Sequence, residues 1–83
     1  MELKDTIELM KSEDYKDRFK AEYFQVKIRY DKLLVMYKKM CDGTLEFTPT
    51  CPKEFYILQL EYMNRYLDIL KRRAKLENID LIS

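Results

Sequence analysis

Basic side chains gather near the end of this 83-residue chain, where they could bind a phosphate group. The run consists of Lys71, Arg72, Arg73 and Lys75. Arginine suits this chemistry because its planar guanidinium donates two parallel hydrogen bonds to phosphate oxygens. A helix C-terminus also favours cations in its own right, so the run is either an anion site or solvated helix surface.

A second basic group comes early in the chain and consists of Lys16, Arg18 and Lys20. If the two long helices expected below run antiparallel, the two basic groups meet at one end. Like charges then repel one another unless nearby acids or a bound anion intervene. The same pairing sets Arg29 level with Arg65, which predicts either ion pairs with acids of these helices or a second ligand site.

Tyrosines are the other candidates for ligand contact, and the chain has seven of them. Several recur at helical spacing, which indicates packing in a core or between helices. The alternative is that Tyr23, Tyr30 or Tyr66 presents a ring face at a pocket between subunits, where a nucleobase could stack.

Catalytic and metal-binding signatures are missing from the sequence. It has no histidine, no glycine-rich phosphate loop and only two thiols, Cys41 and Cys51, too few for a four-ligand zinc site. We therefore expect no enzyme activity, no cofactor and no metal. A disulfide across the turn is conceivable, but in the cytoplasm we expect two reduced thiols, with Cys41 packing as a small apolar group.

Charge and hydropathy limit the partners. The formal net charge is +1, which lacks the basic excess of duplex nucleic-acid binders. No apolar run reaches the ~18–20 residues of a membrane span, and the acidic first residues do not form a signal peptide. The sequence thus predicts a soluble cytosolic protein that binds no membrane and no duplex nucleic acid.

The chain predicts an all-α fold of one domain, 1–83, with few breakpoints because it has a single glycine. A short amphipathic helix over about 2–10 carries Leu3, Ile7 and Met10 on one face. A long helix over about 13–42 follows the N-cap Ser12 and stops at Gly43. After a loop over about 43–51, a second long helix covers about 52–78, and the two long helices form an antiparallel hairpin.

Apolar residues on both long helices cover more surface than one helix pair can bury. The first helix carries a seam in which we expect deep burial of Leu33: Tyr23, Val26, Tyr30, Leu33, Tyr37 and Met40. Phe24, Ile28 and Val35 lie beside it. The second helix carries two stripes, the first being Tyr56, Leu60, Met63, Leu67, Leu70 and Ala74, and the second Phe55, Tyr62, Tyr66, Ile69 and Leu76. The surplus predicts a homo-oligomer, at least a dimer that forms a helix bundle.

Both long helices resemble a family of small phage and prophage proteins related to a crAss-like phage protein. The resemblance covers roughly residues 18–74 and follows the scheme R-x-x-x-E-Y-x-x-L, then K-L, a loop, and Q-L-x-x-M-x-x-Y-x-x-L-x-x-R. Val26 departs from it, standing where the family has leucine. The matching residues are Arg18 to Tyr23, Lys32, Leu33, Gln59, Leu60, Met63, Tyr66, Leu67, Leu70 and Arg73.

In build, the chain is similar to phage sponges that counter CBASS and Thoeris defence by holding cyclic nucleotide signals between subunits, although it lacks the binding motif of either family. This similarity implies a non-catalytic counter-defence protein that sequesters such a signal. Phosphates would be held by Arg18, Arg65, Arg72 and Arg73, and a base would stack on Tyr23 or Tyr66. Two other functions stay open: an anti-CRISPR-like inhibitor that binds a host protein, and a dimerisation module of a phage assembly.

Overall fold

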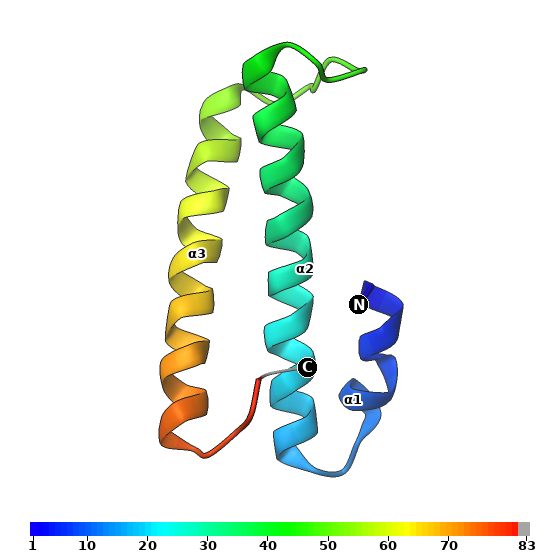
Figure 1. The fold of residues 1–83 in the computed structure, drawn as a ribbon, viewed down its shortest axis with the longest axis vertical. Coiled ribbons are helices and arrows are strands. Elements are labelled where there is room, and N and C mark those ends of the chain that lie inside the picture. The colour runs from blue at the N-terminus through cyan, green and yellow to red at the C-terminus, as the bar shows by residue number, and fades with distance from the viewer. Residues whose placement is uncertain (82–83) are drawn as a thin grey trace.

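Helices make up all the regular secondary structure in residues 1–81, the part of the chain that the computed structural model describes. They are the 3₁₀ helix η1 (Leu3–Thr6), α1 (Ile7–Lys11), α2 (Tyr15–Asp42) and α3 (Lys53–Leu76) (Figure 1). The prediction of an all-α chain is confirmed. No helix in this part combines the length and apolar character needed to cross a membrane. Ile82 and Ser83, the end of the apolar tail, lie outside the described residues.

The start of α2 is fixed by a small set of polar contacts. Asp14 is the N-cap, and its carboxylate accepts a hydrogen bond of 2.9 Å from the Lys16 amide. The Ser12 hydroxyl accepts from the Asp14 amide at 3.1 Å and donates to the Asp17 carboxylate at 2.8 Å. The expected N-cap at Ser12 is therefore wrong by two residues. Ser12 instead holds the capping residue in place, and α2 begins at Tyr15.

The other end of α2 stops where the sequence predicts. Gly43 adopts a left-handed φ of 79°, a conformation open to glycine at little cost, and its amide donates to the Lys39 carbonyl. The Asp42 carboxylate accepts from the amide and hydroxyl of Thr44 at 3.0 and 2.6 Å, which lowers the pKa of Asp42. After the loop, Pro52 caps α3, a place where its missing N–H costs nothing.

The two long helices run side by side in opposite directions (Figure 1). Their buried contact lies toward the two termini. Phe19 and Tyr23 of α2 pack in one cluster with Leu67, Leu70 and Ala74 of α3, and the tail returns to add Ile79. Leu70, only 1% exposed, is among the most buried side chains of the described chain. The first predicted stripe of α3 is thus its inner face.

Toward the loop the two helices bury much less. Between residues 29 and 59 no described side chain is fully buried. Leu33 is only half-buried, so the expectation of deep burial is wrong for the single chain. The physical reason is that neither terminus reaches this half, and each long helix there has one neighbour (Figure 1).

The N-terminal segment docks on α2 through a polar residue. The hydroxyl of Thr6, which is fully buried, donates to the Leu3 carbonyl at 2.7 Å and accepts from the Gln25 amide at 3.0 Å. Ile7 and Met10 are exposed, so the expected face of Leu3, Ile7 and Met10 is wrong. The first turn is a 3₁₀ helix, whose tighter winding rotates the following residues away from the positions that an α-helix gives them.

Leucine truncations test this uneven burial. Leu70→Ala removes a fully buried side chain and should lower the free energy of unfolding by about 2–5 kcal/mol. Leu33→Ala should cost less than half as much, because Leu33 already contacts water. Urea denaturation of both variants at low protein concentration measures the difference, and equal losses would contradict the assignment of the core to the terminal half.

Candidate functional site

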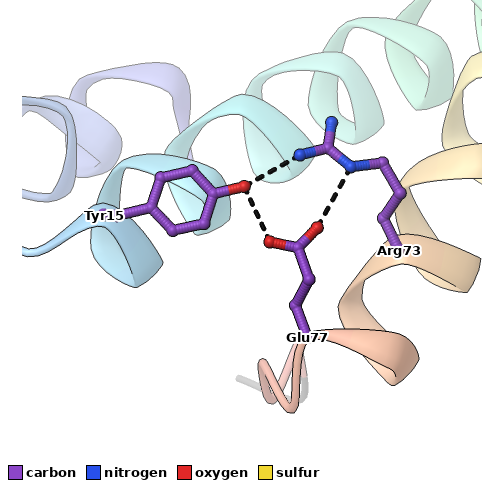
Figure 2. A network of polar contacts seen from close by, with 3 residues as sticks. All are labelled: Tyr15, Arg73 and Glu77. Atoms are coloured by element: carbon purple, nitrogen blue, oxygen red, sulfur yellow. Dashed lines mark hydrogen bonds and ion pairs between the residues drawn. The ribbon is translucent and has the colours of Figure 1, made fainter.

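At the open end of the two long helices, three side chains form a closed polar network (Figure 2). The Tyr15 hydroxyl donates to the Glu77 carboxylate at 2.8 Å and accepts from the Arg73 guanidinium at 2.8 Å. Arg73 also donates to Glu77 through Nε at 3.2 Å. The network ties the first turn of α2 to the end of α3.

The Arg73 side chain is therefore held by contacts within the protein. Its guanidinium also lies 4.9 Å from the centre of the Phe19 ring, within range of a cation–π interaction. The hydrogen bond to Glu77 raises the pKa of Arg73, and the bond to the same carboxylate raises the pKa of Tyr15. Of the two alternatives for this end, a nearby acid or a bound anion, the structure shows an acid, because Glu77 pairs with Arg73. Tyr15 was not among the candidates from sequence. The expected antiparallel pairing sets it near Glu77, and its hydroxyl can bond to that acid.

The early basic group contacts helix-end carbonyls. Arg18 donates to the Ser12 carbonyl at 2.8 Å, just after α1. Lys16 donates to the Asn78 carbonyl at 3.2 Å, just after α3. Both carbonyl groups lie just beyond the last residue of a helix. Lys16 and Arg18 thus bind main-chain carbonyls beside the ends of the chain's own helices.

Of the three candidate stacking tyrosines, Tyr23 is buried, Tyr30 is half-buried and Tyr66 is exposed. Tyr23 is 7% exposed and packs edge-on against Phe24, with ring centres 5.4 Å apart. The expectation that Tyr23 stacks on a base is wrong for this chain, because its ring belongs to the core. Tyr66 is 42% exposed, and its hydroxyl donates to the Glu22 carboxylate, which raises the pKa of Tyr66. This contact orients the ring and leaves part of it open.

Arg65 and Arg72 lie on the outer face of α3, away from the core. Their side chains are 69% and 77% exposed, and each pairs with an acid one turn earlier, Arg65 with Glu61 at 2.8 Å and Arg72 with Asp68 at 3.1 Å. Such exposed pairs contribute only about 0.3–0.5 kcal/mol, so a phosphate can displace the carboxylate. A shallow hollow of about 450 Å³ here is lined by Asn64, Arg65, Asp68, Ile69, Lys71 and Arg72.

Arg29, the remaining arginine, does not join this group. Arg65 bonds to Glu61 on its own helix, which was one of the expected alternatives. Arg29 is exposed and makes no ion pair within residues 1–81. The two exposed arginines that line one hollow are therefore Arg65 and Arg72.

Both cysteines are free thiols on the surface near the loop. Cys41 does not pack as a small apolar group, because it lies beyond the buried half of the chain. Its hydrogen bond with Tyr37 raises the pKa of that phenol. Among residues 1–81, no three acidic or thiol side chains are placed so that they could hold a metal ion.

Comparison with known proteins gives one result. A family model described as Sequestin matches residues 13–76, a range that includes all of α2 and α3. No curated protein and no solved structure matches the chain.

Alkaline pH tests the network at the open end. Because folding raises the pKa of Tyr15 above its ordinary value of 10.0, the protonated phenol stabilises the fold. That contribution is complete below pH ~10 and is lost as the pH rises through the raised pKa. Tyr15→Phe should therefore lower the urea midpoint at pH 8 and have a smaller effect at pH 11.

Tyr62→Phe is the matched control, because Tyr62 is exposed and its hydroxyl has no hydrogen bond within residues 1–81. It should leave the midpoint unchanged at both pH values. An effect of Tyr15→Phe that is equal at pH 8 and pH 11 would contradict a stabilising role for the protonated hydroxyl.

Proposed function

The chain belongs to the Sequestin family, and from this membership we propose that it sequesters a nucleotide signal without transforming it. The family name indicates a sequestering protein, and the matched residues include both long helices. Binding without chemistry agrees with a sequence that has no histidine and no paired nucleophile and base.

The observation that carries the ligand class is the pair of exposed arginines on α3. Arg65 and Arg72 are seven residues apart and project from one face of the helix. Each guanidinium matches the geometry of a phosphate, and a ligand with two phosphates can engage both. This spacing favours a nucleotide with more than one phosphate group over a single free phosphate.

Tyr66 adds the surface for a base. It lies one residue after Arg65, and its partly exposed ring is held by the bond to Glu22. A base stacked on an aromatic ring contributes about 1–3 kcal/mol without sequence selectivity. Arg18 and Arg73 were also expected in the site, but binding there requires them to leave their present partners. We therefore centre the proposed site on Arg65, Tyr66 and Arg72.

The biological role that we propose is counter-defence by a phage. The chain resembles small phage proteins, and in build it is similar to sponges that remove cyclic nucleotide immune signals. Sequestration requires only affinity and sufficient protein, so a small chain with no catalytic machinery can perform it. As in those sponges, we propose that the working form is a homo-oligomer in the host cytoplasm with the ligand between subunits.

A second candidate is inhibition of a host protein by direct binding. It is favoured by the large apolar side chains on the surface of α3, of which Leu76 is 84% exposed. An apolar helix face of this kind can dock in a groove of another protein. This function predicts a complex with a host effector and no response to nucleotides. A plain dimerisation module, the other alternative, binds only itself and likewise gives no response to nucleotides.

A thermal-shift screen against cyclic di- and trinucleotides and isomers of cyclic ADP-ribose tests the proposed function. A ligand that binds only the folded chain should stabilise it by about 2.7 kcal/mol at one hundred times its dissociation constant. The screen should give at least one such ligand, recovered chemically unchanged after release. A screen with no shift in any compound would favour the inhibitor or the dimerisation module.

Charge reversal of the two arginines locates the site. Arg65→Glu combined with Arg72→Glu should abolish the shift, because carboxylates repel phosphate where guanidinium groups bind it. The control is Lys32→Glu with Lys38→Glu, which makes the same charge change at two exposed positions of α2. The control should retain the shift. Loss of binding in both variants would indicate a general effect of net charge.

A further inference from the structure

Four large apolar side chains form a line on the outer face of α3, and we call them the outer row. They are Phe55, Tyr62, Ile69 and Leu76, spaced every seven residues. Their exposed fractions are 62%, 63%, 55% and 84%. They lie away from the inner stripe that packs on α2, so nothing within residues 1–81 buries them.

The spacing makes the outer row nearly straight. Seven residues complete almost two turns, so each member is displaced by only about 20° from the one before. From Phe55 to Leu76 the row extends along the helix for about 31 Å. A line of apolar residues with this period is typical of a helix that pairs along its length with another helix of the same period.

Charged residues border the outer row in a repeating order. An acid precedes each of its first three members, and an arginine follows Tyr62 and Ile69 after three residues. In a helix these positions fall on one side of the row, which is why Glu61 pairs with Arg65 and Asp68 with Arg72. The edge on the other side has no acid and consists of Gln59, Tyr66 and Arg73.

We propose that the outer row is the contact of a parallel homodimer in which Arg65 and Arg72 of both copies hold one phosphate-bearing ligand. A second copy of the chain fits against the outer row because its own outer row has the same seven-residue spacing over the same length. In a parallel pair, the acidic edge of one copy faces the acid-free edge of the other. An antiparallel pair would set Glu61 against Asp68 of the second copy, and like charges at an interface oppose association.

The parallel pair also explains why arginines occur at these positions. In this pair, the residues three after Phe55, Tyr62 and Ile69 face their own copies across the two-fold axis, as Leu58 does favourably. Arg65 and Arg72 would also face their own copies, and these like charges repel one another unless an anion lies between the two chains. A phosphate supplies that anion, and only the dimer completes the set of donors. This inference rests on the proposed function for the identity of the ligand.

Sedimentation equilibrium tests the contact. The wild-type chain, of mass 10.2 kDa, should sediment at twice that mass, and Ile69→Glu should sediment as a monomer with unchanged helical circular dichroism. Val35→Glu is the matched control, an exposed branched apolar residue on α2, and should remain dimeric. Tyr62→Glu repeats the test at another member of the row. A monomeric wild type, or dimeric variants at both row positions, overturns the proposal.

Disulfide cross-linking tests the orientation. In a chain with both native cysteines changed to serine, Leu58→Cys should give a covalent dimer under mild oxidation, since a parallel pair sets residue 58 beside its copy. Ile57→Cys, one position off the contact, should not. Cross-linking equal in both variants, or absent from Leu58→Cys, overturns the parallel arrangement and with it the shared arginines.

Inorganic pyrophosphate tests the shared anion site without any nucleotide. It should lower the dimer dissociation constant at least tenfold in the wild type, and the combined change Arg65→Gln and Arg72→Gln should remove this response. A dimer dissociation constant that does not change with pyrophosphate overturns the shared site.

The nucleotide from the thermal-shift screen separates the two proposals. Undiminished nucleotide binding by monomeric Ile69→Glu overturns the shared site and the placement of the ligand between subunits, and leaves standing the proposal that the chain sequesters a nucleotide. A dimer that responds to pyrophosphate but binds no nucleotide supports the shared site and removes the proposed ligand class.

Discussion

The packing of Leu67, Leu70 and Ala74 on Phe19 and Tyr23 is the contact on which the rest of the structure depends. It holds the two long helices together at the end where both chain termini return. The short N-terminal segment and the tail are too small to fold alone, and they gain order only by docking on this half. The core of the chain is therefore at one end.

This concentration of the core determines what the surface can do. A chain of two long helices gives each helix one long neighbour, so the outer face of α3 keeps its apolar row exposed. At the open end, by contrast, Arg73 is paired with a carboxylate, and Lys16 and Arg18 bind main-chain carbonyls. Apolar surface and weakly paired arginines therefore coincide on the outer face of α3, which is where both proposals place recognition.

Much of the fold could be predicted from sequence because it depends on neighbours along the chain. Gly43 ends α2 because the left-handed conformation there suits glycine, and the inner stripe of α3 follows from spacing alone. Choices between near-equal local options could not be predicted. Asp14 and Ser12 can both cap a helix, and the network among Ser12, Asp14 and Asp17 decides between them.

For the candidate site, the sequence by itself determined which side chains could bind phosphate and that α3 carries two apolar stripes. Only the tertiary structure decided which of them stay accessible. Tyr23 is in the core and Arg73 is held by Tyr15 and Glu77, because the ends of α2 and α3 meet there. Arg65 and Arg72 remain open because nothing in the described chain packs on their face. The spacing of residues along a helix follows from the sequence alone, whereas the accessibility of a side chain depends on which distant segments pack against it.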